Sequence, residues 1–509
     1  MTPMRTLLSL AAIALLADVA FGGAAAPEPV GQEPASREAS RPAPMPSHDV
    51  SGVGIDPFEE LTRCLNEPTV PASPPPEVPA DSILTEQPEV NCFAWQEFIA
   101  LNWKASPTSP GEPDPNAGGD TFGDPVPEAV VWETYQEVSQ LFPPGGRVPA
   151  PWGSRQPLPP ECREALGGDV LPGDVETALV MTAKFSSDLG GRQVLDEVNE
   201  AGVSPPAFLV AQSRELVHYE VRINQDFFNY VADAGNRFYD ARYQAAAVQP
   251  GGQGIDLPDG ADSFGDTGAI EIKAGWLEIP DDQRHRFLTA DAVLVTPGED
   301  PPCRRAVVGL IQLHIIHKTV SMPNWTWATF EHVDAAPDRV EVEEGRLDPP
   351  YLFYDPDCQP PTAPECVPNR KPQPGDPMDR PIQVVRTVPI PDYVRALNER
   401  VHATIREANP DSVFQYYRLI NTLWPQSGEG FPVGGIIPLS QGGAAPTTGL
   451  SNVLAETYAQ TRSCLDCHQF APIACSSASG PDPQYAADYS FQLSRASEPH
   501  PPAFCGGGD

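Results

Sequence analysis

The stretch Ala306-Val-Val-Gly-Leu-Ile-Gln-Leu-His-Ile-Ile-His317 predicts a long β-strand, because apolar and β-branched residues dominate it. A second stretch, Ala269-Ile-Glu-Ile-Lys-Ala-Gly-Trp-Leu-Glu-Ile279, alternates apolar with polar residues. This period of two is typical of half-buried antiparallel strands. The two stretches therefore predict strands of an antiparallel sheet.

Shorter strand-like runs cover residues 178–182 and 217–223. Helices are expected around this sheet, at residues 93–103, 130–141, 227–231, 237–247, 391–408, 412–424, 452–460 and 485–496. The predicted fold class is α+β, with a central antiparallel sheet and helical N-terminal and C-terminal parts. The helical C-terminal part contains the sequence motif that indicates a chemical role.

This motif is Cys464-Leu465-Asp466-Cys467-His468, the pattern by which a c-type haem is attached. Each thiol would form one thioether bond with a haem vinyl group, and the spacing of the cysteines matches the separation of the vinyls. His468 would then lie under the iron as its proximal ligand. The predicted cofactor is one covalent haem c.

A cysteine pair of this spacing has three other interpretations. A redox dithiol needs a thioredoxin-like context, which the chain lacks. A zinc site needs a second ligand pair at suitable spacing, and none follows. An ordinary disulfide of an exported protein remains the main alternative to haem.

The start of the chain predicts export. Residues 1–26 hold Arg5, an apolar run and small residues, as a secretory signal peptide does. A disordered Pro-rich linker is expected at 27–57, and an α+β body at 58–380 with an irregular Pro/Asp-rich insertion at 335–380. Residues 381–509 form the helical haem c segment. The mature protein is expected in the periplasm or outside the cell, with no membrane span.

Eight further cysteines fit an exported, disulfide-bonded protein. They are Cys64, Cys92, Cys162, Cys303, Cys358, Cys366, Cys475 and Cys505. Their spacing does not fix the pairing, and the first expectations are Cys358–Cys366 and Cys475–Cys505.

The net charge of −37, from 69 acidic and 32 basic residues, argues against nucleic acid and anionic membranes as partners. Two interpretations of the charge remain open. It keeps the protein soluble, or it steers the protein toward a basic redox partner protein. Steering predicts that association depends strongly on salt.

The distal ligand of the iron is less evident, because no methionine follows His468 and the last one in the chain is Met378. A Met–His pair would need Met181, Met322 or Met378 to reach in from the body. His500 lies among prolines and is a poor ligand.

The preferred distal candidates are His314 and then His317, on the predicted strand. The alternation places them on opposite faces, so at most one can face the haem. His314 is preferred because it lies mid-strand among apolar residues. His332 is a further candidate, and each of these histidines could instead be an ordinary hydrogen-bonded core residue.

Several stretches resemble a little-characterised family of large, exported, single-haem bacterial cytochrome c proteins. They are residues 93–103 (FAWQEFIALNW), 269–276 (AIEIKAGW), 314–319 (HIIHKT), 325–334 (WTWATFEHVD), 455–468 (AETYAQTRSCLDCH) and 487–496 (ADYSFQLSRA). The resemblance implies covalent haem on Cys464 and Cys467, with His468 as iron ligand, and export. It implies no substrate and no distal or catalytic residue.

Three functions remain open on this evidence. The first is electron transfer, or a redox subunit of a periplasmic oxidoreductase, with both axial positions of the iron filled. The second is a haem enzyme with an open distal site, acting on peroxide, oxygen or a small reductant. The third is a surface or binding protein with a structural haem.

Overall fold

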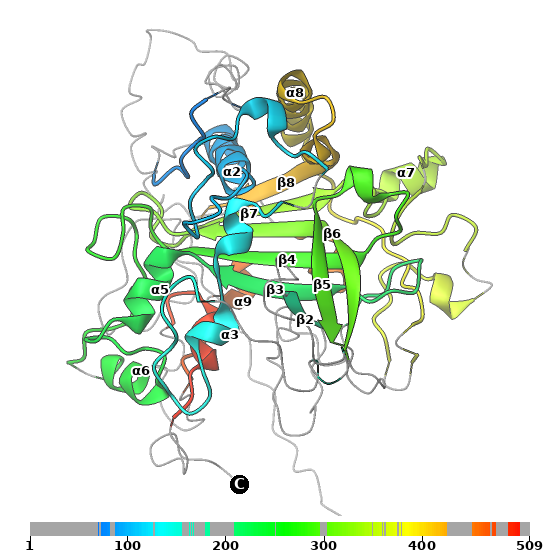
Figure 1. The fold of residues 1–509 in the computed structure, drawn as a ribbon. Coiled ribbons are helices and arrows are strands. Elements are labelled where there is room, and N and C mark those ends of the chain that lie inside the picture. Colours follow the sequence, from blue (N-terminus) through cyan, green and yellow to red (C-terminus); the bar gives the residue numbers. More distant parts are fainter. Residues whose placement is uncertain are drawn as a thin grey trace, which may run out of the picture. The chain divides into compact units, whose positions relative to one another are not determined.

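The computed structural model describes residues 73–81, 87–125, 128–154, 179–183, 208–249, 251–295, 303–348, 350–358, 363–373, 379–424, 450–468, 471–474 and 487–498, with a few single positions between them. All of them belong to one compact unit, residues 55–509. A β-sheet forms its centre, and helices pack against the sheet (Figure 1). The expected signal peptide (1–26) lies outside the described residues, as does the linker (27–57).

In the described part of the chain, the sheet has eight strands. They are β1 (Gln136–Glu137), β2 (Leu179–Ala183), β3 (His218–Ile223), β4 (Ile270–Glu278), β5 (Thr289–Val295), β6 (Cys303–His317), β7 (Thr326–His332) and β8 (Tyr417–Leu423). The long strand β6 pairs with β4 along one edge, and with β5 and then β7 along the other. Strand β8 adds to the outer edge of β7.

The pairing is antiparallel throughout, except that β2 and β5 are parallel. Five strands form a closed circuit through the pairings β2–β3, β3–β4, β4–β6, β6–β5 and β5–β2. Strands β7 and β8 extend the sheet from this circuit. The predicted α+β fold with a central antiparallel sheet is therefore confirmed, with one parallel pair that the sequence did not indicate.

The longer helices of the described residues are α2 (Gln87–Leu101), α5 (Gln225–Ala232), α6 (Ala241–Ala247) and α8 (Asp392–Ala408). Short helical turns are α3 (Val138–Leu141), α7 (Arg339–Glu344), α9 (Leu465–His468) and the 3₁₀ turns at residues 119–121, 131–134, 284–286, 364–366, 413–416 and 491–495. Helices α2 and α8 pack on the β7–β8 end of the sheet (Figure 1). Phe330 of β7 lies against Trp95 and Phe98 of α2, with ring centroids 5.0 and 4.4 Å apart.

Helix α2 is more deeply buried than its sequence suggested. Almost every residue from Val90 to Leu101 is buried, including Asn91 and Glu97, so the helix lies inside the fold rather than on its surface. The side-chain amide of Asn102 donates to the Phe98 carbonyl at 2.8 Å and satisfies one of the acceptors left at the helix end. Helix α8 is the amphipathic one, with Val394, Leu397, Val401 and Ile405 on its buried face.

The C-terminal part is less helical than predicted. Residues 412–424 form a 3₁₀ turn and strand β8 instead of a helix. The strand is buried on both faces, so its sequence lacks the alternation that marks a half-buried strand. Residues 452–460 form turns, and only residues 491–495 of the expected 485–496 helix are helical. The expected helix at 130–141 is two short turns around β1.

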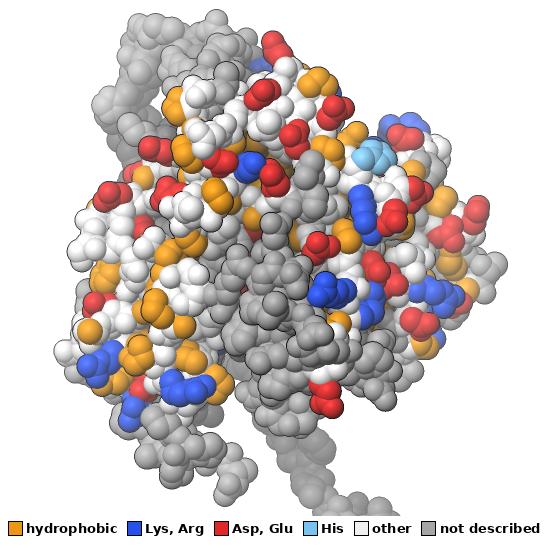
Figure 2. All heavy atoms as spheres, in the orientation of Figure 1, with side chains coloured by type: hydrophobic (Ala, Val, Ile, Leu, Met, Phe, Trp, Pro, Cys, Tyr) orange, Lys and Arg blue, Asp and Glu red, His pale blue; other side chains and the backbone are white. Residues whose placement is uncertain are grey.

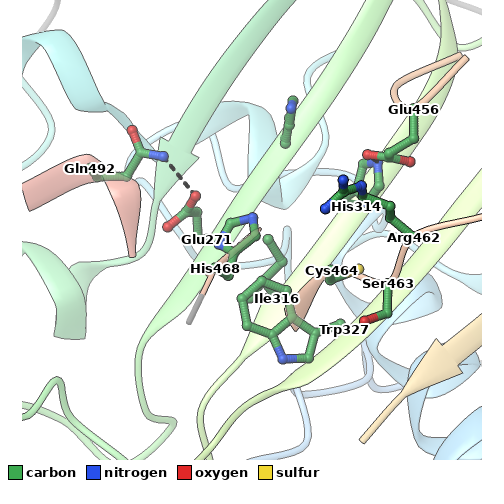
Figure 3. Close-up of a pocket in the computed structure, with 11 residues that line it drawn as sticks. Glu271, His314, Ile316, Trp327, Glu456, Arg462, Ser463, Cys464, His468 and Gln492 are labelled. Atoms are coloured by element: carbon green, nitrogen blue, oxygen red, sulfur yellow. Dashed lines mark hydrogen bonds and ion pairs between the residues drawn. The ribbon is translucent and has the colours of Figure 1, made fainter. Parts of the chain in front are cut away.

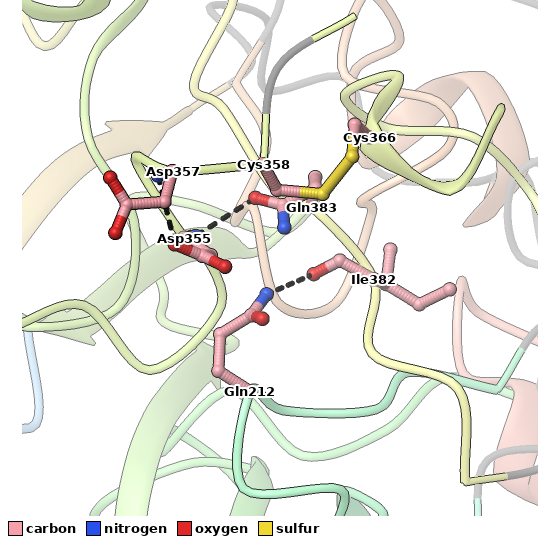
Figure 4. Close-up of a disulfide and its surroundings, with 7 residues drawn as sticks. All are labelled: Gln212, Asp355, Asp357, Cys358, Cys366, Ile382 and Gln383. Carbon is pink, nitrogen blue, oxygen red and sulfur yellow. Dashed lines mark hydrogen bonds between the residues drawn. A yellow bond between two sulfur atoms is a disulfide. The ribbon is translucent and has the colours of Figure 1, made fainter. Parts of the chain in front are cut away.

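Two disulfides are present among the described residues. Cys358–Cys366 closes a short loop in the Pro/Asp-rich insertion, as expected (Figure 4). Hydrogen bonds from Gln212 to Ile382 and from Asp355 to Gln383 hold the chain around it (Figure 4). The second disulfide, Cys162–Cys303, ties an earlier segment to the start of β6. The expected Cys475–Cys505 bond lies outside the described residues.

A buried ion pair joins β7 to the segment before α8. The guanidinium of Arg386 contacts the carboxylate of Glu331, and both side chains are almost completely buried. The other oxygen of Glu331 accepts from the Val453 amide at 2.7 Å. Glu331 therefore connects three parts of the chain. Arg386 is the cation that contacts it, and Arg418 lies opposite it on β8.

We predict that Arg386→Met lowers the free energy of unfolding by roughly 3–5 kcal/mol, because it removes the cation that contacts the buried carboxylates of Glu331 and Asp338. The matched control is Arg214→Met, which removes an ion pair with Asp379 whose side chains are 68% and 65% exposed. That control should change stability by less than about 1 kcal/mol. Urea unfolding of both variants measures the difference, and equal losses would contradict the prediction.

Candidate functional site

The sheet register sets polar side chains of three strands side by side on one face. Lys273 of β4 lies opposite His314 of β6, which lies opposite Thr329 of β7. The neighbouring row of the same face is Glu271, Ile316 and Trp327. Because side chains alternate along a strand, the residues between them point to the other face, which helix α2 covers.

The C-terminal segments lie on this polar face, although they have little regular secondary structure. Both oxygens of Glu271 hold residues 490–492: Oε2 accepts from the Ser490 hydroxyl at 2.8 Å, and Oε1 from the Gln492 amide at 2.7 Å. The Asn452 side chain donates to Thr329 Oγ1 at 2.9 Å. A segment without a helix or strand must satisfy its polar groups in this way.

A pocket remains between the sheet face and these segments (Figure 3). It is lined by Glu271, Lys273, His314, Ile316, Trp327, Glu456, Arg462, Ser463, Cys464, His468 and Gln492. The structure therefore brings Cys464, His468 and His314 to one pocket.

The cysteine motif forms a single helical turn, α9, at the edge of this pocket. The amides of Cys467 and His468 both donate to the Cys464 carbonyl, at 3.2 and 3.0 Å. Residues three and four apart lie on the same side of such a turn, so the two thiols and the imidazole share one side. Neither cysteine is in a disulfide.

The His468 ring is held from three directions. Its Nδ1 lies 2.8 Å from the Tyr489 carbonyl oxygen. A carbonyl can only accept, so Nδ1 carries the proton and the neutral ring has its lone pair on Nε2. Trp327 and Phe491 pack edge-on against the ring, with centroids 4.5 and 4.9 Å away. This arrangement is the one that orients a metal-binding histidine.

His314 lines the same pocket, with Glu456 and Arg462 beside it (Figure 3) and Lys273 opposite it on β4. The His314 Nε2 atom is 3.8 Å from Glu456 Oε1, which is a contact and not a hydrogen bond. The amide of Asn452 donates to the other oxygen of Glu456 at 2.7 Å and orients this carboxylate. His314 is only 7% exposed.

His317 lies on the opposite face, as expected from the alternation. It is fully buried, with Nδ1 2.6 Å from Glu97 Oε1 of α2 and Nε2 2.8 Å from the Thr267 carbonyl. Nε2 must donate to that carbonyl, so the close contact with Glu97 requires a second proton, shared by the two side chains. Both nitrogens of His317 serve the core, and His317 does not line the pocket of His468.

The remaining ligand candidates are elsewhere. His332 donates from Nε2 to the Arg286 carbonyl and accepts at Nδ1 from the Asp334 amide, so both its nitrogens are used. Met322 packs in a separate apolar cluster with Phe93 and Trp424. Met378 and His500 lie outside the described residues, as does the side chain of Met181.

The residues of the pocket fit the demands of a covalent haem. A thiol and an imidazole with an oriented Nε2 come from one helical turn, and Ile316 and Trp327 supply apolar walls. His314 supplies a second imidazole from the sheet. No group of three or more His, Cys, Asp or Glu side chains among the described residues is arranged to bind a metal ion.

Comparison with known proteins found no matching family model, curated protein or solved structure. None of the described helices combines the length and apolar character needed to cross a bilayer. The fold and the site are therefore interpreted from their own geometry.

Several residues of the site were not foreseen from the sequence. Glu271, Glu456 and Arg462 line the pocket, and the Tyr489 carbonyl orients His468. The sequence did indicate a role for Glu271, because an acidic residue on the polar face of a strand needs hydrogen-bond donors or another segment packed over it. The Tyr489 contact is made by a backbone atom, which no sequence pattern marks.

We predict that the contribution of His332 to the free energy of unfolding falls as the pH drops from 7 to 5, because burial lowers the pKa of His332 to about 4. The unfolded chain then binds a proton below about pH 6.5 that the folded chain does not bind, which favours unfolding. A shift of this size corresponds to about 2 kcal/mol at pH 5. Urea unfolding at both pH values should show a smaller fall for His332→Gln, and identical falls would contradict the prediction.

Proposed function

We propose that this chain is an exported c-type cytochrome with one covalent haem, which transfers electrons or serves as the redox subunit of a periplasmic oxidoreductase. When bound, haem c supplies one-electron chemistry between ferric and ferrous iron. The observation that carries the proposal is the environment of His468. Its ring faces a pocket shared with Cys464, and its Nδ1 proton is committed to the Tyr489 carbonyl.

In this proposal each residue of the motif has a separate task. The sulfurs of Cys464 and Cys467 hold the haem by thioether bonds, and Nε2 of His468 binds the iron. Trp327 and Phe491 restrict rotation of the His468 ring, so that the ligand is in place before the metal binds. Such preorganisation reduces the rearrangement that accompanies a change of oxidation state.

His314 is the proposed second axial ligand. It projects from the middle of β6, a strand paired on both edges, so its backbone position is rigid. The pocket brings this imidazole to the same cavity as His468, whereas His317 serves the opposite face. An iron with two histidine ligands has no open position for a substrate, which favours electron transfer.

The charge of the chain supports a protein partner of opposite sign. Acidic side chains are scattered over the described surface in Figure 2, with fewer lysines and arginines among them. With a net charge of −37, association with a basic redox protein would be fast at low salt and slower as salt screens the attraction.

A second candidate function, catalysis at an open iron site, is favoured by one feature of the pocket. Glu456 and Arg462 lie beside His314, so three groups that can move a proton or bind an anion face the cavity together. If His314 does not bind the iron, it is placed to act as an acid or base toward peroxide, oxygen or a small reductant.

We predict that the protein, made with a haem-attachment system, carries haem that survives denaturation. Its pyridine haemochrome spectrum should be that of a c-type haem, and a haem stain should persist on a denaturing gel. Cys464→Ser combined with Cys467→Ser should abolish both signals. His468→Ala keeps both thiols and should change the spectrum strongly. Colourless wild-type protein would refute the proposal.

We further predict that the wild-type iron is six-coordinate, low-spin and inert to carbon monoxide and cyanide. His314→Ala should convert it to a high-spin form that binds both ligands, because one axial position becomes open. The matched control is His317→Gln, which should leave the spectrum unchanged, since His317 faces α2. A wild-type protein that is already high-spin and binds carbon monoxide would favour the open-site enzyme.

A further inference from the structure

The chain at Asp488 and Tyr489 adopts a left-handed backbone just where it supports His468. Their φ angles are +48° and +66°, in a region that bulky residues rarely occupy. Aspartate tolerates this region better than tyrosine does, so two such residues in succession are strained. A conformation of this kind persists only where the surroundings enforce it.

The surroundings that enforce it centre on Lys318. Asp488 Oδ2 lies 2.6 Å from Lys318 Nζ and also accepts from the Leu257 amide at 2.7 Å. Asp488 and Lys318 are each only 2% exposed. Lys318 directly follows β6, and its own amide donates to the Ala269 carbonyl at 3.0 Å. The ammonium group is therefore attached to the chain at the end of the central strand β6.

These contacts form a continuous connection from the sheet to the axial histidine. Lys318 fixes Asp488, Asp488 fixes the left-handed turn, and the turn directs the Tyr489 carbonyl at Nδ1 of His468. A strong hydrogen bond from Nδ1 makes Nε2 a more basic ligand. A more basic axial ligand stabilises ferric iron and so lowers the reduction potential.

We propose that the Lys318–Asp488 ion pair is a positioning device that keeps the reduction potential of the haem low, through the Tyr489 carbonyl and His468. The inference rests on the proposed function, since it assumes that His468 binds haem iron. It adds to that function two residues outside the motif, Lys318 and Asp488, that set the reduction potential of the iron.

The test compares two carboxylates that contact the same ammonium group. Asp488→Asn keeps the shape of the side chain and an acceptor for Leu257, but removes the charge that holds Lys318. Asp256→Asn removes the charge of the other carboxylate that contacts Lys318. The Asp256 side chain is 73% exposed. Both variants are made with haem attached, and their potentials are measured by spectroelectrochemical titration at fixed pH and salt.

We expect Asp488→Asn to raise the reduction potential and to speed exchange of the His468 ring proton, followed by NMR of the ferrous protein. Asp256→Asn should match wild type in both measurements. An Asp488→Asn protein that carries haem but has the wild-type potential and exchange rate would overturn the inference. It would leave the proposed function intact, because the pyridine haemochrome assay reports haem attachment separately.

A second variant keeps the test decisive if Asp488→Asn does not fold. Lys318→Arg retains the buried positive charge but changes its geometry, so it should raise the potential by a smaller amount. A wild-type potential in Lys318→Arg would then overturn the inference. Wild-type protein without haem would instead refute the proposed function, and this inference with it.

Discussion

Strand β6 is hydrogen-bonded on both edges and, from Val308 to His317, buried on both faces. The arrangement of the site depends on this constraint. Side chains of a strand alternate strictly between its faces, so neighbouring residues of β6 serve different parts of the protein. His314 and Ile316 line the pocket, whereas His317 bonds to Glu97 in the helical layer. A shift of register by one residue would exchange these roles and place the wrong histidine at the pocket.

The C-terminal part of the chain shows how an irregular segment can be held accurately. It has few helices or strands of its own, and polar side chains on the sheet replace the missing backbone partners. Glu271 holds residues 490–492, Glu331 holds the Val453 amide, and the Tyr219 hydroxyl donates to the Leu454 carbonyl at 2.5 Å. Buried charged groups of this kind are stable only when they are paired or fully hydrogen-bonded. The same bonds that hold the segment also fix the position of the motif above the sheet.

Two histidines of β6 illustrate why the surroundings, and not the residue type, decide a role. His317 is surrounded by partners that occupy both ring nitrogens, so it has no lone pair to offer a metal. His314 faces a cavity in which a carboxylate and a guanidinium are its charged neighbours. The proposed electron-transfer function and its open-site alternative differ only in whether this imidazole binds the iron or acts beside it.

The sequence alone determined the features that depend on neighbouring residues. The alternation in residues 269–279 predicted β4, and the apolar, β-branched run at 306–317 predicted β6. Helical spacing predicted α8, and the short loop between Cys358 and Cys366 made their disulfide a first expectation. The motif of Cys464, Cys467 and His468 is likewise local, and its haem-binding role remains a prediction.

Only the tertiary structure decided the features that depend on contacts between distant segments. Strand β8 was mistaken for a helix because burial on both faces removes its alternation, and the parallel pairing of β2 with β5 has no local signature. The hydrogen bond between Tyr489 and His468 and the ion pair between Lys318 and Asp488 join residues 21 and 170 positions apart. Such contacts are set by how the sheet and the irregular segments pack together, which the order of residues within any one segment does not specify.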